Sequence, residues 1–433
     1  MKLPSRSFFP FLFSLFTAAL CAAADSAPSA DALRAEADAL AADIAARLGS
    51  SVRPGVPFPG YRPPVAPDAD PFAAIDPDAF EADRAELARL TDHRPKPTPS
   101  SPIPDYSTEA ARRADVLPRL TNLAAAADAF ATPGYRSSLP GLVFPPDGPS
   151  SPDTYWIEPR FTDAVIAARY LVHRIRLALA QGNPASALAD RARLLAVTDI
   201  LLREPGSLGP SVTVSFRNPA AYPDLPPDAL ADAARDASAL ADDLEARWPD
   251  LLLSSFHCDL SDALVNLGPA PDDTPADVWV QTLRLAAIRC LDTTADAIRA
   301  ALALPPGPER AAALSELSSF SFGPEVPSPE ILAKETVTVA WHGTFITLAR
   351  SRDNASVVLA AVALLRYHRD TGALPDTLGA LVPDYLPALP LAFADGASLT
   401  YTPVSTPLPG FTLSFPAPHP PTSAFFPLPP SPS

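Results

Sequence analysis

Proline constrains the fold of this chain more than any other feature of its sequence. The 433 residues include 56 prolines against 17 glycines, whereas proline makes up only ~5% of an average protein. Inside a helix, proline removes a backbone hydrogen bond and clashes with the preceding turn. Helices must therefore begin or end at prolines, and part of the length must form extended connectors. The remainder is long enough for two or three domains, which commonly take ~100 to 200 residues each.

The first 24 residues have the pattern of an export signal. A basic start is followed by a short apolar run over residues 8–20 and by three alanines. The run is short for a membrane-spanning helix and contains Pro10, so we expect cleavage after Ala24 and a periplasmic or extracellular protein. Two alternatives are an uncleaved signal that holds the chain at the membrane and a lipid anchor on Cys21. No later segment is apolar for long enough to cross a bilayer.

The charge of the chain argues against a nucleic-acid partner. Its formal net charge is −16, and removal of the signal takes away two basic residues and no acidic one. A surface this acidic repels phosphate backbones and anionic lipids. We therefore expect a partner that is a protein or another component of the cell envelope. The sequence does not indicate an oligomeric state.

The mature N-terminus, residues 25–50, is predicted to form one amphipathic helix. Apolar residues recur at three- and four-residue steps between Ala30 and Leu48, and Gly49 follows as a stop. Residues 51–105 are rich in proline and are interrupted by a helical pattern over residues 78–90. This stretch is either a disordered linker or a strap that lies over the body.

A tight αα-hairpin is the clearest motif of the predicted helical body, residues 106–350. Apolar residues form a continuous seam along each of two helices between Phe161 and Leu202. Gly182, Asn183 and Pro184 lie between them and supply a C-terminal glycine, an N-cap and a proline at the first helical position. We therefore expect two antiparallel neighbours that pack closely.

Further helices are predicted along the rest of the body, most of them with proline or glycine at their ends. The pattern is helical over residues 227–247, 251–267, 275–304, 308–318 and 331–350. Residues 212–216 alternate apolar and polar side chains and are predicted to form a short strand. The β-branched residues 336–339 make a strand the alternative to a helix there.

Residues 351–416 are predicted to form a small α+β unit. A helix ends near Asp370 with Gly372 outside it, and Pro375 starts a second short helix. Asp395 and Gly396 are a turn pair, and alternating segments around Tyr401 and at 411–415 predict an antiparallel β-hairpin. The proline-rich tail, residues 417–433, is expected to be disordered. The predicted fold is therefore mainly α, an irregular multi-helix body of αα-hairpins with a C-terminal α+β unit.

Two parts of the chain resemble known families. The hairpin around Gly182 resembles a tetratricopeptide hairpin, although no second copy follows at a ~34-residue period. The order of Tyr367, Asp370, Gly372, Pro375 and two leucines, followed by Asp395, Gly396 and Tyr401, resembles the globular region of type II secretion pseudopilins. Taken together, residues 161–415 look similar to a family of uncharacterised exported bacterial proteins. The pseudopilin leader and the acidic metal-binding end are missing, which argues against filament assembly and calcium binding.

Two cysteines remain after signal cleavage, Cys258 and Cys290. In an oxidising compartment they could form a disulfide that closes a loop of about 33 residues and adds ~3 to 4 kcal/mol in the chain-entropy model. The alternative is a pair of buried thiols on facing helices, and the sequence leaves both open. Although His257 and Asp259 flank Cys258, adjacent helical side chains point in different directions and cannot form a catalytic set.

A search for catalytic and cofactor motifs finds none of the common ones. The chain has no nucleophile elbow, zinc-protease helix, phosphate-binding loop or dinucleotide fingerprint. Its six histidines are far apart, without metal-ligand spacing, so we expect neither a metal nor another cofactor. The sequence favours a non-catalytic exported binding or scaffolding protein of the bacterial envelope. An envelope hydrolase with a dispersed active site and a secretion-apparatus accessory protein are the alternatives.

Overall fold

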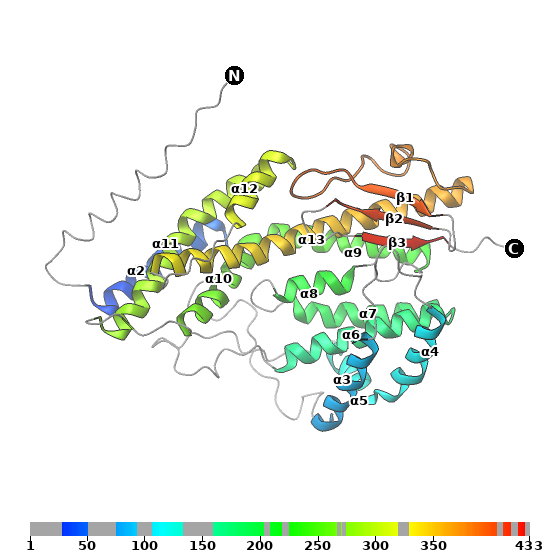
Figure 1. The fold of residues 1–433 in the computed structure, drawn as a ribbon, viewed down its shortest axis with the longest axis horizontal. Helices are drawn as coiled ribbons and strands as arrows, with labels where there is room; N and C mark the ends of the chain where they lie inside the picture. The colour runs from blue at the N-terminus through cyan, green and yellow to red at the C-terminus, as the bar shows by residue number, and fades with distance from the viewer. Residues whose placement is uncertain are drawn as a thin grey trace, which may run out of the picture.

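The fold was analysed in a computed structural model. It describes residues 28–50, 75–92, 106–132, 159–202, 208–218, 225–265, 270, 274–318, 329–404, 410–416 and 423–428. The predicted signal sequence and most of the proline-rich stretch 51–105 lie outside these residues. The described chain forms twelve α-helices, α2 to α13, and one three-stranded sheet. The expected mainly α fold with a C-terminal β-hairpin is confirmed (Figure 1).

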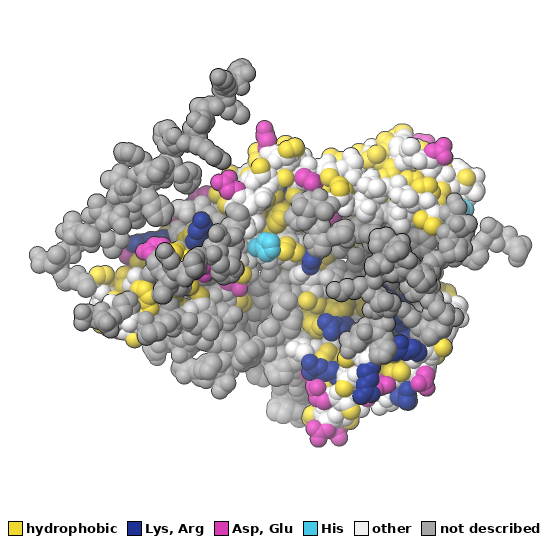
Figure 2. Space-filling model, in the orientation of Figure 1, with side chains coloured by type: hydrophobic (Ala, Val, Ile, Leu, Met, Phe, Trp, Pro, Cys, Tyr) yellow, Lys and Arg dark blue, Asp and Glu magenta, His cyan; other side chains and the backbone are white. Residues whose placement is uncertain are grey.

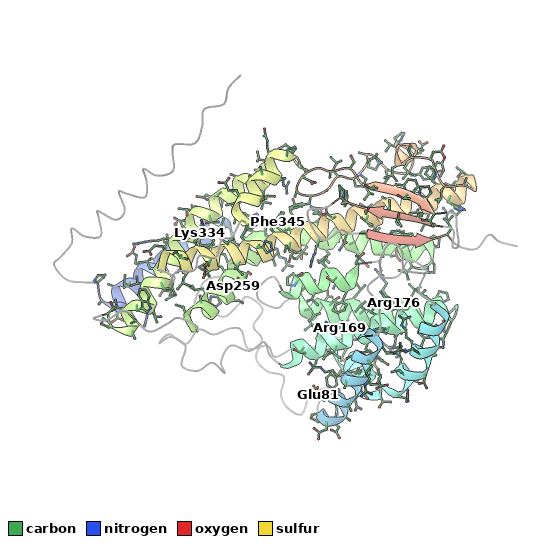
Figure 3. The ribbon with its side chains drawn as sticks, in the orientation of Figure 1. Glu81, Arg169, Arg176, Asp259, Lys334 and Phe345 are labelled. Carbon is green, nitrogen blue, oxygen red and sulfur yellow. The ribbon has the colours of Figure 1, made fainter. Side chains whose placement is uncertain are left out.

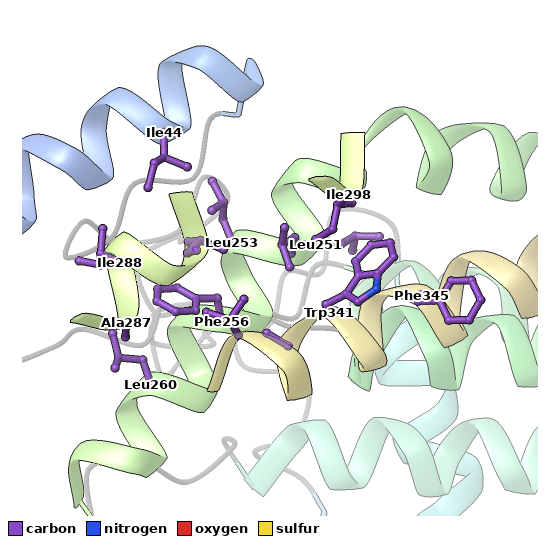
Figure 4. Close-up of a cluster of buried hydrophobic side chains, with 14 of the residues drawn as sticks. Ile44, Leu251, Leu253, Phe256, Leu260, Ala287, Ile288, Ile298, Trp341 and Phe345 are labelled. Carbon is purple, nitrogen blue, oxygen red and sulfur yellow. The ribbon is translucent and has the colours of Figure 1, made fainter. Parts of the chain in front are cut away.

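The first lobe packs four helices around one half of the longest helix, α13. Its core includes Ile44 from the N-terminal helix, Phe256, Ile288 and Ile298, and Trp341 from α13, all almost fully buried (Figure 4). Trp341 also lies against Phe345, with ring centroids 5.8 Å apart. The four helices are α2 (Ala30–Leu48), α10 (Trp248–Val265), α11 (Ala276–Ala303) and α12 (Pro308–Ser318).

The second lobe is a layered set of shorter helices that includes the predicted αα-hairpin. Leucine, isoleucine and alanine side chains fill its core, together with Val358 from α13. Asp83 of α3 accepts from the backbone N–H groups of Asn122 and Leu123 and so caps the start of α5. The elements are α3 (Pro77–Asp92), α4 (Tyr106–Val116), the 3₁₀ helix η2 (Leu117–Arg119), α5 (Thr121–Ala131), α6 (Pro159–Ala180), α7 (Pro184–Leu201), α8 (Leu208–Arg217) and α9 (Pro227–Ala246).

Helix α13 (Pro329–Thr371) connects all three parts of the fold. It is one helix of 43 residues, roughly 65 Å long at 1.5 Å per residue, and it contributes to the cores of both lobes and of the C-terminal unit. The alternative of a strand at residues 336–339 is wrong, because these residues are helical. Buried threonine hydroxyls donate to the carbonyl four residues earlier, as from Thr336 to Leu332 and from Thr344 to Ala340, so the helix itself satisfies them. No break occurs at the expected domain boundary, residues 350 and 351.

The C-terminal unit is a 3₁₀ helix and a small sheet that cover the last turns of α13. The strand order is β1-β2-β3, both pairs are antiparallel, and Tyr401 lies opposite Leu413. Phe411 and Leu413 face inward against Leu364 of α13, as the alternation predicted. The elements are η5 (Leu378–Leu381), β1 (Thr400–Val404), β2 (Gly410–Ser414) and β3 (Ser423–Pro427). The expectation of a disordered tail is wrong for β3.

The predicted strand at residues 212–216 is also wrong, because this segment is α8. Its helical spacing places Thr213 and Arg217 on one face, toward α7. Arg217 Nε donates to Thr198 Oγ1 at 2.8 Å, and Thr213 Oγ1 donates to the Thr198 carbonyl at 3.2 Å. Contacts with a neighbouring helix therefore override the strand pattern. The helices predicted from residue 227 to residue 318 are confirmed to within a few residues of their ends.

Charged side chains of both signs mix on the surface of the second lobe (Figure 2). On α3, Glu81 pairs with Arg84 and Glu86 pairs with Arg89 along the same helix. Pairs at this spacing stabilise an isolated helix by only about 0.2–0.5 kcal/mol each. Among the described helices, none is long and apolar enough to cross a membrane.

Candidate functional site

The hairpin motif forms as the sequence predicted. Gly182 adopts a left-handed conformation with φ 69° after α6, and the Asn183 side chain accepts from the backbone N–H of Ser186 at 3.1 Å. Pro184 is the first residue of α7. The motif therefore ends one helix and begins the next, and the Asn183 side chain is bonded to the backbone.

The motif at the end of α13 likewise holds the C-terminal unit together. Gly372 has φ 76° and donates its N–H to the His368 carbonyl at 2.8 Å, which ends the helix. The Tyr401 hydroxyl donates to the Pro375 carbonyl at 3.0 Å and so ties β1 to the loop after the helix. Burial, with a smaller effect from Asp376, raises the pKa of Tyr401. The expectation that Pro375 starts the second short helix is wrong, because that helix is η5 and begins at Leu378, while Pro375 lies in the loop before it. The sequence also did not predict the contact between Tyr401 and Pro375.

Asp395 and Gly396 form the expected turn. The Asp395 side chain accepts from the Ala397 N–H at 2.9 Å, and Gly396 has φ 67°. The same turn packs on the loop between α11 and α12, where Gly307 N–H donates to the Ala394 carbonyl at 3.3 Å. A turn predicted only as part of the small unit therefore also contacts the helical body.

The two cysteines lie on different helices of the first lobe, Cys258 on α10 and Cys290 on α11, and both are half-buried thiols in the structure. Burial raises the pKa of Cys290, while a hydrogen bond with Thr294 and the charge of Lys334 lower it. Lys334 lies near the start of α13 (Figure 3). The disulfide stays a prediction.

The histidines that the structure describes are spread over three helices. His173 on α6 and His257 on α10 are buried, whereas His342 is exposed on α13 and His368 lies in its last turn. His173 Nδ1 accepts from Arg113 Nε at 3.3 Å. Within the described residues, no group of three or more His, Cys, Asp or Glu side chains could hold a metal ion. His93 and His419 lie outside these residues.

Charged residues gather around one phenylalanine where α13 meets α9, α12 and the loop before β1. We define this group as the junction cluster: Glu245, Arg310, Arg352, Asp353, Phe393 and Asp395. Asp353 is 7% exposed, and its Oδ1 accepts from the Phe393 N–H at 2.9 Å. Burial raises the pKa of Asp353 to about 6, the hydrogen bond from Phe393 lowers it, and the nearby Asp395 raises it.

Arg310, in the first turn of α12, is the second buried charge of the junction cluster, with 5% exposure. Its Nη1 donates to the Leu304 carbonyl at 3.3 Å, and its Cζ lies 4.2 Å from the centroid of the Phe393 ring. Among the described residues, Nε and Nη2 find no hydrogen-bond partner. Burial lowers the pKa of Arg310, Glu245 raises it and Arg352 lowers it.

Arg352 connects the junction cluster to α9. Its Nη1 lies 2.7 Å from Asp242 Oδ1, and its guanidinium also pairs with Glu245. Arg352 therefore points to the second lobe, while Asp353, the next residue along α13, binds the loop of the C-terminal unit. Two adjacent residues of one helix thus contact two different parts of the molecule.

Comparison of the chain with family models, curated proteins and solved structures finds no match. The candidate site therefore has to be judged from its own chemistry.

The junction cluster combines a buried acid whose pKa is raised to about 6 with a buried guanidinium. Such groups are typical of active sites, although structural ion-pair networks shift pKa values too. Asp353 and Arg310 are both buried, and their contacts join separate elements of the fold. The sequence missed this cluster because its members come from segments as far apart as residues 245 and 395. The one local signal was a short polar stretch, residues 350–354, between two mainly apolar parts of the predicted helical pattern.

Proposed function

We propose that the chain is a non-catalytic, exported binding or scaffolding component of the bacterial cell envelope. The observation that supports this best is the contact pattern of the junction cluster. Its buried charges bind backbone groups and aromatic rings of neighbouring elements: Asp353 binds the Phe393 N–H, and Arg310 binds the Leu304 carbonyl and the Phe393 ring. Such contacts hold a framework together, and a reacting substrate would have to displace them.

The long helix α13 supports the same proposal. One element that enters three hydrophobic cores keeps the two lobes and the C-terminal unit in a fixed arrangement. A scaffold requires this rigidity, whereas catalysis would require an accessible group with a tuned pKa. Export rests on the pattern of residues 1–24, and N-terminal sequencing of the mature protein, expected to begin at Asp25, tests it.

Site-specific photo-crosslinking in the envelope tests the binding function. A photoreactive residue at Leu391, which is 50% exposed in the C-terminal unit, is expected to capture a specific envelope component. The same residue at Leu188, 40% exposed on α7, is the matched control on another part of the surface. If neither position captures a component in envelope preparations, the binding proposal is wrong.

An envelope hydrolase is the second candidate, because the raised pKa of Asp353 suits a general acid or base. Ester, peptide and glycoside substrates can be offered to the wild type, to Asp353→Asn and to the matched control Asp370→Asn. Hydrolysis that Asp353→Asn abolishes and Asp370→Asn retains would replace the scaffold proposal with this one. No hydrolysis by the wild type is the outcome we expect.

A secretion-apparatus accessory role is the third candidate, favoured by the C-terminal unit. The unit contains the Gly372 stop, the Asp395-Gly396 turn and a hairpin with Tyr401, and the resemblance of this order to pseudopilins supports the candidate. Deletion of the gene in its native host would then reduce the release of secreted proteins. Normal secretion in the deletion strain would remove this candidate.

A further inference from the structure

We propose that Asp353 and the loop of residues 391–396 form a proton-operated latch, which holds the C-terminal unit on the helical body more tightly in acid than at neutral pH. Asp353 belongs to α13, and the loop belongs to the unit that follows it. The latch is therefore a contact between parts of the molecule, and it goes beyond the scaffold function proposed above.

Three contacts make up the latch. Asp353 Oδ1 accepts from the Phe393 N–H at 2.9 Å, and the Gly307 N–H donates to the Ala394 carbonyl at 3.3 Å. The Phe393 and Ala394 side chains, each 6% exposed, insert into the core of the first lobe. The apolar contacts hold the loop in place, and the carboxyl group is the member whose charge changes with pH.

The charges around the carboxyl group disfavour its ionised form. Asp395, in the same loop, is a like charge whose field acts against ionisation. From α12, Arg310 lies over the Phe393 ring and donates to Leu304, and Arg352 on α13 pairs with Asp242 and Glu245 of α9. Among the described residues, the buried carboxylate therefore has one backbone donor and no cationic partner. A carboxylate with so little compensation holds its proton to an unusually high pH.

The direction of the pH effect follows from the difference between the pKa of Asp353 with the loop docked and its pKa with the loop released. With the loop docked, the pKa of Asp353 is about 6, and with the loop released, water restores an ordinary value near 3.8. The docked form binds the proton more tightly, so its stability is greatest in acid and is lost as the pH rises through 6. The ratio of docked to released loop falls roughly 50-fold between pH 4 and pH 7 and then levels off.

Hydrogen exchange of the full chain tests the latch directly, because the Phe393 N–H exchanges only after its bond to Asp353 opens. Peptides that cover residues 391–396 are compared from pH 4 to pH 8, with labelling times scaled for the intrinsic exchange rate. Protection in the wild type is expected to fall about tenfold between pH 5 and pH 7. In Asp353→Asn, whose side chain accepts the same hydrogen bond without a charge, protection is expected to be independent of pH.

Two further variants complete the test. Asp370→Asn, on the same helix but outside the latch, is expected to keep the wild-type profile. Asp395→Asn removes the like charge and keeps the turn's acceptor, so the loss of protection is expected to shift to lower pH. Constant protection in the wild type from pH 4 to pH 8, or an unchanged fall in Asp353→Asn, would overturn the latch. If Asp353→Asn does not fold, the test rests on Asp395→Asn. Loss of protection at the same pH as in the wild type would then overturn the proposal.

Discussion

A Cβ atom on Gly396 would lie 2.8 Å from the carbonyl oxygen of Pro306. These two residues are where the turn of the C-terminal unit meets the loop between α11 and α12. Gly396 also has φ 67°, a conformation that only glycine adopts readily. Two independent constraints therefore require glycine here, one from the backbone of the turn and one from the close approach of the loop.

Gly396→Ala is expected to destabilise the protein by about 2 to 4 kcal/mol, since it adds a steric clash to the left-handed conformation. Gly372→Ala is the matched control, because Gly372 has φ 76° and nothing lies within 4 Å of its added Cβ. The control is expected to cost only about 1 kcal/mol. Urea unfolding of both variants measures the difference. Equal losses of stability would mean that the loop around Pro306 moves away from the added Cβ at no energetic cost.

The buried carboxylate of Asp190 supports a second prediction. It is 1% exposed and accepts from Arg174 Nε at 2.9 Å and from Arg193 Nη1 at 3.0 Å. Asp190→Asn removes the charge that both guanidinium groups share, so we expect a loss of about 2 to 3 kcal/mol in the free energy of unfolding. Asp232→Asn, in an exposed pair with Arg235, should change it by less than about 0.5 kcal/mol. If Asp190→Asn changes the free energy of unfolding as little as Asp232→Asn does, water replaces the interactions that Asp190 loses.

Helix ends were predictable because their chemistry is local. Pro308 opens α12, Gly182 and Asn183 separate α6 from α7, and Gly372 closes α13. Each of these residues acts through its own backbone conformation or through a hydrogen bond a few residues away. The hairpin of β1 and β2 was predictable for the same reason, since its alternation lies within two short segments.

The missed features depend on contacts between distant segments. The segment that contains Thr213 and Arg217 alternates like a strand, yet both side chains bond to Thr198 on α7, which selects a helix. The junction cluster was missed because nothing near Asp353 in the sequence indicates that Phe393 will donate to it. Side-chain pairs of this kind are set by the packing of whole helices, which periodicity alone does not describe.

Helix α2 allows a comparison of apolar packing with ion pairs. Arg284 Nη2 lies 2.5 Å from Asp38, Arg289 pairs with Glu36, and Ile44 is 1% exposed in the same contact with α11. Arg289→Ala is expected to cost less than about 1 kcal/mol, because Arg289 and its partner Glu36 are both exposed. Ile44→Ala is expected to cost about 2 to 4 kcal/mol through lost burial and a cavity. Urea unfolding measures both losses of stability. A larger loss in Arg289→Ala than in Ile44→Ala would mean that ion pairs, not apolar packing, hold α2 on α11.

Thiol chemistry decides the state of Cys258 and Cys290. If both are thiols, Cys290 should react with iodoacetamide more slowly in the folded protein than after unfolding, because burial raises its pKa and the thiolate is the reactive form. If they form the predicted disulfide, neither should react in denaturant until a reductant is added. Mass spectrometry of the protein isolated from its host, labelled with and without reductant, distinguishes the two outcomes. Cys258→Ser is the matched variant: under the thiol outcome it leaves Cys290 labelling in denaturant unchanged, and under the disulfide outcome it makes Cys290 reactive without reductant.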